Sequence, residues 1–225
     1  MEATTVSITK VSDEGCTVQE DLVAVEAEYR VYVDGSPELS FTCTPEGIEE
    51  MAIGALFSRG YIQAAAEIGS IRISDGEIFV TRNESAVPIA HAVADKPSLC
   101  PEAVIRAVRS VFGNTDTLFH RTGCAHSCAL MRGGEILCTF EDIGRHNALD
   151  KAIGFALRGG IPLCECAVFT SGRISGDYMA KVIRAKIPIA VSRAAVTDEA
   201  IRLAKGHGIT LYGFVRGNSA NLYNS

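Results

Sequence analysis

Four arginines stand shortly after four apolar, strand-like runs in the second half of the sequence. Helix-like patterns separate the runs, so we expect parallel strands whose carboxyl ends meet at one sheet edge, where such sheets bind their ligands. Arginine's planar guanidinium suits phosphate and carboxylate groups, and neighbouring helix N-termini add free amide groups. Each arginine alone could be a solvated loop residue or an ion-pair partner, but together they favour a phosphate-bearing ligand. The four are Arg145, Arg173, Arg193 and Arg216.

The loop around Arg145 is rich in polar groups. Glu141 and Asp142 precede the arginine, and His146 and Asn147 follow it. The acids and the imidazole could take part in acid–base chemistry, whereas Asp142 and Asn147 could equally cap the helix that follows. The sequence has no G-x-S-x-G nucleophile turn, no P-loop and no G-x-G-x-x-G segment that opens a helix. A nucleophilic hydrolase is therefore not favoured.

Cys100 is the first candidate for thiol chemistry among the eight cysteines. It directly precedes Pro101, and proline is favoured at the first position of a helix, so we expect Cys100 at the N-cap. A thiol there tends toward thiolate, because the helix dipole and the free amides stabilise negative charge. The thiolate attacks another sulfur or carries a persulfide. A buried cysteine that packs as a small hydrophobe is an equally good interpretation.

The segment TGCAHSC contains a second candidate thiol. If this segment is extended, Cys124, His126 and Cys128 lie on one face, since side chains alternate along a strand. Such a face could bind a metal ion with the help of another cysteine. The spacing is not that of a familiar zinc site, however, and we expect no stable metal.

Composition excludes several classes of function. The 225-residue chain is 47% hydrophobic and carries a net charge of −6, which argues against a nucleic-acid-binding protein. No apolar run approaches the ~20 residues of a membrane span. The N-terminal segment MEATTVSITK does not resemble a signal peptide, so we expect a cytoplasmic protein whose cysteines are reduced.

Residues 1–95 predict a small α+β lobe. Alternating apolar and polar residues on either side of Asp34-Gly35, and again of Asp75-Gly76, indicate two β-hairpins. A helix is expected between them, with Thr44 as its N-cap and Gly60 at its end. The sheet edges and the amphipathic helix of this lobe are compatible with a homodimer.

Residues 96–225 predict an α/β core domain. A helix from Pro101 to Phe112 leads to two strands joined around Gly133-Gly134, after which helices and strands alternate. This alternation predicts a mainly parallel sheet covered by helices, with right-handed crossovers.

Several segments together resemble one known family. On them the chain is identified as a member of the formate dehydrogenase accessory sulfurtransferase family (FdhD), with a match that runs from about Glu26 to Tyr223. EDIGRHNALDK is the most specific part. The segments are TPEGIEEMAIGALFSRGYI, RTGCAHSCAL, EDIGRHNALDKAIG, TSGRISGDYMAKVIRAKIPIAVSRAAVT and GITLYGFVRGNSANLY.

The resemblance implies a three-layer core like that of the cytidine deaminases, and a function. Family members pass sulfur from a cysteine desulfurase to the molybdenum cofactor, bis(molybdopterin guanine dinucleotide), before it enters apo formate dehydrogenase. Two pyrophosphates and two guanosines fit an edge ringed by arginines. The family's cofactor-binding segment corresponds here to Phe214, Val215, Arg216, Gly217, Asn218 and Ser219. The other contacts that we expect are Arg145, His146, Asn147, Arg173, Arg193 and His126.

Deaminase chemistry is not expected, because the zinc-binding H-x-E and P-C-x-x-C motifs are absent. A second departure concerns sulfur transfer. The family carries a C-x-x-C before the helix that starts here at Pro101, and Pro97 occupies the place of its first cysteine, the usual persulfide carrier. Two hypotheses follow. In one, Cys100 alone carries the persulfide, with Cys124 as an assisting thiol. In the other, the protein is a non-enzymatic carrier or chaperone of the cofactor.

Overall fold

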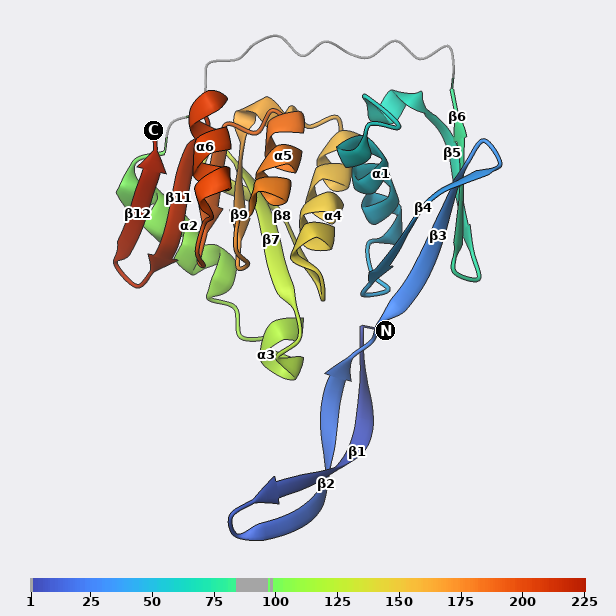
Figure 1. The fold of residues 1–225 in the computed structure, drawn as a ribbon, viewed down its shortest axis with the longest axis vertical. Helices are drawn as coiled ribbons and strands as arrows, with labels where there is room; N and C mark the ends of the chain where they lie inside the picture. The colour runs from blue at the N-terminus through green and yellow to red at the C-terminus, as the bar shows by residue number, and fades with distance from the viewer. Residues whose placement is uncertain (1, 84–96, 98) are drawn as a thin grey trace.

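The computed structural model describes residues 2–83, 97 and 99–225, and its larger part is a layered α/β core (Figure 1). A six-stranded sheet has the order β12-β11-β10-β9-β7-β8. Helices α4, α5 and α6 pack on one face of this sheet, and α2 packs on the other. The strands are β7 (His126–Arg132), β8 (Glu135–Asp142), β9 (Cys166–Thr170), β10 (Ile189–Ser192), β11 (Thr210–Arg216) and β12 (Ser219–Asn224). The helices are α2 (Pro101–Phe112), α4 (Arg145–Arg158), α5 (Gly176–Arg184) and α6 (Asp198–Gly206).

The sheet is mixed, so the prediction of a mainly parallel sheet is wrong. Strand β10 is parallel to β9 and β11, whereas β7 is antiparallel to both of its neighbours and β12 is antiparallel to β11. Tight turns at Gly133-Gly134 and at Gly217, all with positive φ, join two of these antiparallel pairs, β7–β8 and β11–β12. The antiparallel strand β7 lies between β8 and β9, so β8 still runs in the same direction as β9, β10 and β11. Their carboxyl ends therefore meet at one edge, as the arrangement of arginines requires.

The first half of the chain adds a four-stranded sheet and a helix. The sheet has the order β4-β3-β6-β5. Both predicted hairpin turns are confirmed: Asp34-Gly35 and Asp75-Gly76 have positive φ at both positions, as the tight turns of hairpins require. The elements are β3 (Ala27–Val33), β4 (Ser36–Cys43), α1 (Ile48–Arg59), β5 (Ile68–Ser74) and β6 (Glu77–Arg82), with short 3₁₀ turns η1 (Ala65–Glu67) and η2 (Leu163–Glu165). The expected boundary near residue 95 lies outside the described residues.

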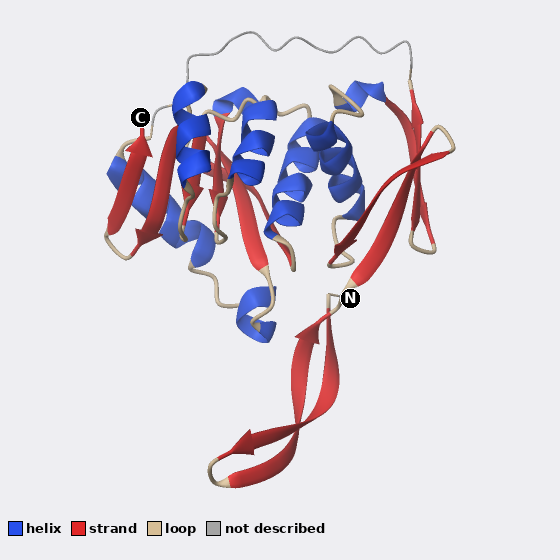
Figure 2. Ribbon diagram, in the orientation of Figure 1, coloured by secondary structure: helices blue, strands red, loops and turns tan. Residues whose placement is uncertain are grey.

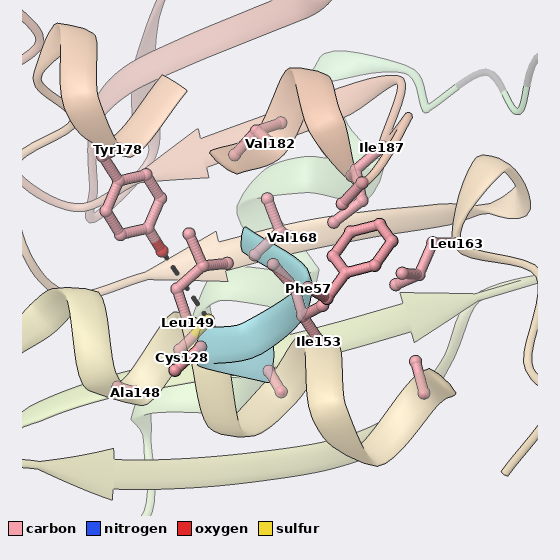
Figure 3. Packing of buried hydrophobic residues seen from close by; sticks show 14 of the residues in the cluster. Phe57, Cys128, Ala148, Leu149, Ile153, Leu163, Val168, Tyr178, Val182 and Ile187 are labelled. Atoms are coloured by element: carbon pink, nitrogen blue, oxygen red, sulfur yellow. Dashed lines mark hydrogen bonds between the residues drawn. The ribbon is translucent and has the colours of Figure 1, made fainter. Parts of the chain in front are cut away.

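Helix α1 packs against α4 through two glycines that let the backbones touch. A Cβ built on Gly54 would lie 1.8 Å from the carbonyl oxygen of Asp150, and one built on Gly154 would lie 1.9 Å from that of Glu50. Phe57 of α1 therefore reaches the same apolar cluster as Ile153 of α4 and Val168 of β9 (Figure 3). The two halves of the chain share one hydrophobic core.

The start of α1 corrects one prediction. The helix begins at Ile48 after Gly47, which is left-handed at φ 61, and not after Thr44. Thr44 is fully buried, and its backbone and hydroxyl groups bind residues of the core domain. Tertiary hydrogen bonds thus take the groups that a helix cap would use.

The sequence did not predict the hairpin of β1 (Ala3–Ser12) and β2 (Gly15–Ala24), the short helix α3 (Leu118–Thr122) or the strand β12. The β1–β2 hairpin projects from the body as an isolated ribbon (Figures 1 and 2). Its base packs on the chain around α3, where Ala3 meets Leu118 and Ala125. Among the described helices none is long and apolar enough to cross a membrane.

Candidate functional site

A hollow of about 640 Å³ lies at the sheet edge where β8 to β11 end. One wall is the end of α2 with its connection to α3, and the other comprises residues of β7 and β8 and the segments where β9, β10 and β11 end. Arg193 and Arg216 line it, together with His126, Ser171 and Glu141. The hollow combines cationic, hydroxyl and imidazole groups, which suits an anionic, hydrogen-bonding ligand.

Arg216 is held by the backbone at Arg193, and the Arg193 guanidinium lies over an aromatic ring of α2. The Nε of Arg216 donates to the carbonyl oxygen of Arg193 at 2.7 Å, and the guanidinium of Arg193 lies 5.3 Å from the ring centre of Phe112. Ser192 is fully buried and fixes the loop, since its hydroxyl donates to the Gly172 carbonyl at 2.7 Å. Both guanidinium groups thus have defined positions on the hollow's wall.

Arg145 and His126 pack closely against the loop that follows β9. A Cβ on Gly172 would lie 3.0 Å from the Cβ of Arg145 and 3.3 Å from the Nδ1 of His126. Burial, with the positive charges of Arg145 and Arg173, lowers the pKa of His126 below 6.5. Within the described part of the chain, the Nε of Arg145 is buried and has no hydrogen-bond partner. Arg145 is not among the residues that line the hollow, and an anion that reached its Nε would supply the missing acceptor.

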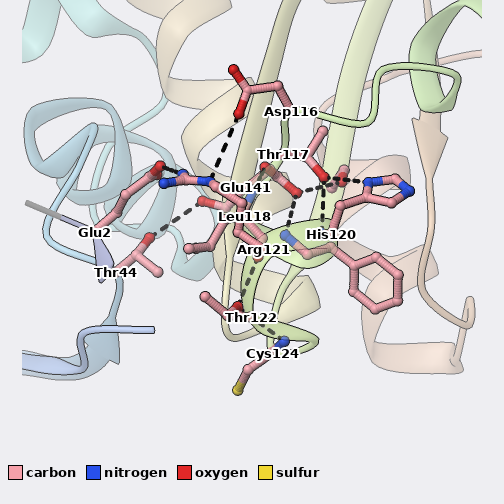
Figure 4. A network of polar contacts seen from close by, with 12 residues as sticks. Glu2, Thr44, Asp116, Thr117, Leu118, His120, Arg121, Thr122, Cys124 and Glu141 are labelled. Atoms are coloured by element: carbon pink, nitrogen blue, oxygen red, sulfur yellow. Dashed lines mark hydrogen bonds and ion pairs between the residues drawn. The ribbon is translucent and has the colours of Figure 1, made fainter. Parts of the chain in front are cut away.

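Glu141 orients helix α3 at the rim of the hollow. Its carboxylate accepts hydrogen bonds from the backbone N–H groups of Leu118 at 2.5 Å and Phe119 at 3.4 Å, and from the Ser127 hydroxyl at 3.0 Å (Figure 4). Thr117 caps the same helix by accepting from the N–H of His120. Sequence reasoning missed α3, although a threonine cap and the closing Gly123 were its signals.

Asp142 and Asn147 form a structural clamp, so the expectation that Asn147 faces the ligand is not supported. The Asn147 amide donates to the Thr42 carbonyl at 2.7 Å and to Asp142 at 2.9 Å. Asp142 also pairs with Lys151 at 2.7 Å, and both side chains are fully buried. The Thr44 hydroxyl lies within hydrogen-bond distance of both charged groups. This network joins the first half of the chain to the core.

His146 faces helix α5 and is not among the residues that line the hollow. Its ring lies 5.7 Å from that of Tyr178. Burial, followed by the positive charges of Lys181 and Arg145, lowers the pKa of His146 to about 4. This imidazole is therefore neutral at physiological pH.

The predicted binding segment after Gly213 divides into different roles. Arg216 lines the hollow, whereas Val215 is buried in the core. Phe214 is 42% exposed with a left-handed φ of 51. Gly217, Asn218 and Ser219 form the turn into β12, where Arg109 donates to the Gly217 carbonyl and to Asn218. Of this segment, the structure brings only Arg216 into the lining, and Arg173 is exposed beside the same edge.

The two candidate thiols lie at different places. Cys100 is exposed and is the N-cap of α2, as predicted, but the hollow lies at the other end of this helix, ~18 Å away. A second hollow of about 340 Å³ runs along α2 from Leu99, and it shares Ser110 and Ile136 with the first. Cys124 is exposed just before β7, at the arginine-bearing edge, and its sulfur points away from the polar network (Figure 4).

Four of the remaining cysteines, Cys43, Cys128, Cys138 and Cys166, are buried or partly buried and pack inside the protein. Burial is the main cause that raises the thiol pKa of Cys43 to about 12 and those of Cys138 and Cys166 to about 11. Cys128 is fully buried beside the Tyr178 hydroxyl (Figure 3), and its pKa is raised further. In the described residues no three His, Cys, Asp or Glu side chains are grouped to hold a metal ion, so the zinc hypothesis gains no support.

The chain was compared with known protein families and with known proteins. The model of the FdhD/NarQ family matches residues 24–96 and 83–225. The chain belongs to the FdhD/NarQ family. It is 32% identical to the "Sulfur carrier protein FdhD" of Sulfolobus acidocaldarius, over 99% of this chain and 97% of that protein. It is 31% identical to that of Wolinella succinogenes, over 91% and 81%.

A solved structure has the same fold. It is a putative formate dehydrogenase accessory protein from Desulfotalea psychrophila, with a TM-score of 0.86 and 29% identity. The match covers 100% of this chain and 98% of that one, so the projecting β1–β2 hairpin lies within the matched region although the family model begins only at residue 24.

Proposed function

We propose that this protein is a cytoplasmic sulfur carrier that acts in the maturation of formate dehydrogenase. It takes sulfur from a cysteine desulfurase as a cysteine persulfide. It passes this sulfur to the molybdenum cofactor, bis(molybdopterin guanine dinucleotide), before the cofactor enters apo formate dehydrogenase. The cofactor is the cargo that the protein binds. The α/β core that holds the cargo is of the cytidine deaminase type without its zinc chemistry.

The observation that carries this proposal is the hollow at the carboxyl ends of β8 to β11. Arg193 and Arg216 line it. Arg145 is not a lining residue, but its buried Nε lacks an acceptor among the described residues. The nucleotide half of the cargo carries a pyrophosphate, whose oxygens accept the charge-assisted hydrogen bonds that guanidinium groups donate. The family relatives, named sulfur carrier proteins, support the same assignment.

Cys100 is the thiol proposed to carry the sulfur. Its thiolate attacks the outer sulfur of the desulfurase persulfide, a new S–S bond forms on Cys100, and the desulfurase cysteine leaves as a thiolate. Cys100 is exposed, so a partner protein can reach it. The hollow along α2 offers a route from this end of the helix toward the arginine-bearing edge. Cys124, at that edge, is the proposed assisting thiol.

A second candidate function is a cofactor carrier that transfers no sulfur. Pro97 in place of a cysteine favours it, as does the ~18 Å between Cys100 and the hollow. The two functions share the nucleotide site and differ only in the thiol.

Guanosine diphosphate, a stand-in for the nucleotide half, tests the shared site by calorimetry. We expect Arg193→Ala and Arg216→Ala each to weaken binding about tenfold or more, since each removes a charge-assisted hydrogen bond. Arg202→Ala is the matched control, because Arg202 is an exposed arginine of α6 that pairs with Glu199. Unchanged binding in both site variants, or no binding by the wild type, would contradict the proposal.

A further inference from the structure

The strand that carries Arg216 is irregular just before this residue. In the β11–β12 ladder Gly213 pairs with Asn221 and Arg216 pairs with Ser219, so two residues of β11 lie opposite one residue of β12. Phe214, the first of the two, is left-handed at φ 51. Such a β-bulge bends its strand and re-aims side chains beside binding sites. Beyond the bulge, Arg216 belongs to the last pair of the ladder, so the ladder alone holds it weakly.

Arg109 of α2 binds the turn that follows Arg216. Its guanidinium donates to the Gly217 carbonyl, from Nη2 at 3.1 Å and from Nε at 3.3 Å. Nη2 also donates to the side-chain oxygen of Asn218. Because the guanidinium is planar and rigid, a fork that reaches two acceptors fixes both of them relative to the helix. The turn is therefore tied to α2 as well as to β12.

Both segments that this contact joins belong to the wall of the arginine-bearing hollow. Ser110 and Phe112 follow Arg109 on α2 and line the hollow, and Arg216 lines it from β11. Arg109 itself is not among the described residues that line it. Behind the wall, Val215 packs in the same apolar cluster as residues of α2. Arg109 thus lies where it sets the position of Arg216 relative to α2 without touching a ligand in the hollow.

The hydrogen bonds of Arg109 should contribute little to the stability of the whole fold. Arg109 is exposed, and both of its acceptors are neutral groups of an exposed turn. Water replaces exposed hydrogen bonds readily when one partner is removed. The loss of Arg109 should therefore change the position of the turn and of Arg216, while the core remains folded.

We propose that Arg109 is a positioning residue of the nucleotide site: it holds the β11–β12 turn on α2 and so aims the Arg216 guanidinium at a phosphate of the ligand. This inference rests on the proposed function, which assigns Arg216 to the nucleotide half of the cofactor. It also gives Gly217 and Asn218 a role, because these residues hold Arg109 and do not contact the ligand.

A double-mutant cycle with guanosine diphosphate, measured by calorimetry, tests this role. Arg109→Ala should weaken binding about three- to tenfold in the wild-type background, but less than about twofold in the Arg216→Ala background, because Arg109 acts through Arg216. Equal losses in the two backgrounds would overturn the proposal, since Arg109 would then act on the ligand itself, by contact or by charge. Arg202→Ala removes another exposed helical arginine and should leave binding unchanged.

Asn218→Ala covers the case in which Arg109→Ala perturbs α2. This variant removes one acceptor of Arg109 at the exposed turn and leaves the helix unchanged. It should weaken binding in the same direction as Arg109→Ala, and the two substitutions together should cost no more than Arg109→Ala alone. Losses that multiply in the double variant would overturn the proposal.

The same titrations distinguish failure of this inference from failure of the proposed function. A wild type that does not bind guanosine diphosphate contradicts the proposed function, and this inference with it. Binding that is weakened in Arg216→Ala but unchanged in Arg109→Ala overturns this inference alone.

Discussion

Asp142 and Lys151 form an ion pair of 2.7 Å in which neither side chain is exposed to solvent. The Thr44 backbone N–H donates to Asp142 at 3.1 Å, and the Lys151 ammonium donates to the Thr44 hydroxyl at 2.8 Å. Within the segment EDIGRHNALDK, the side chains of Asp142, Asn147 and Lys151 thus bond the two halves of the molecule together. Arg145, from the same segment, packs against the loop that follows β9.

Removing either member of the Asp142–Lys151 pair should lower the free energy of unfolding. Lys151→Met leaves the Asp142 carboxylate buried without its counter-charge, and we expect a loss of ~3–5 kcal/mol in the free energy of unfolding. Denaturant titration measures it. Arg158→Ala is the matched control, since Arg158 pairs with Glu49 and Glu50 at the surface and should cost less than ~1 kcal/mol. Similar losses in the two variants would contradict the clamp.

Because α1 and α4 touch at two glycines, adding a single methyl group at either glycine should destabilise the fold. Gly54→Ala and Gly154→Ala each place a Cβ under 2 Å from a backbone oxygen, and the helices must separate. We expect a loss of ~3 kcal/mol or more in each variant. Gly206→Ala, where the helical Cβ meets nothing within 4 Å, should be neutral or slightly stabilising. Equal thermal unfolding midpoints in the three variants would contradict the close contact between α1 and α4.

His146 makes stability depend on pH. Its pKa falls to about 4 in the fold, whereas an unfolded histidine titrates near 6.5. The unfolded state thus binds the proton first as pH falls. The stabilisation is fully present above the unfolded value and is lost progressively between pH 6.5 and 4. We expect a loss on the order of 1 kcal/mol, because partial exposure screens the effect.

Denaturant titrations at several pH values measure this loss. His146→Asn should flatten the dependence, while His207→Asn, at an exposed histidine, should not. An imidazole of His146 that titrates by NMR near 6.5 would contradict the prediction.

Thiol reactivity should divide the cysteines by exposure. Cys16, Cys100 and Cys124 are exposed, so iodoacetamide should modify them in the native protein near neutral pH. Cys43 and Cys166 should react only after unfolding, because their raised pKa keeps them as thiols and burial blocks access. Peptide mapping before and after denaturation checks this, and rapid native labelling of Cys43 would contradict it.

Local chemistry explains which parts of the fold were predictable. Asp-Gly turns, a proline at the first helical position and alternating strands act over a few residues, so both hairpins and the helix from Pro101 to Phe112 were predicted. Parallel strand ends also brought the arginines to one edge as the pattern required. The β1–β2 hairpin was missed because it is exposed on both faces and shows no core-facing pattern.

The roles of individual site residues depended on distant partners. Asn147 bonds to Thr42, 105 positions away in the sequence, and Asp142 bonds to Thr44, 98 positions away. No local pattern contains such pairs. Likewise, the helix that makes Cys100 an N-cap also carries it ~18 Å from the hollow, which spacing alone did not indicate.

The central claim is that Cys100 accepts sulfur, and intact-mass spectrometry tests it most directly. The protein is incubated with a cysteine desulfurase and cysteine, as wild type, Cys100→Ala and Cys124→Ala. A gain of one sulfur atom in the wild type and in Cys124→Ala, absent from Cys100→Ala, is the predicted result. No gain in the wild type, while a C-x-x-C relative is loaded under the same conditions, would contradict sulfur transfer and leave the cofactor carrier as the function.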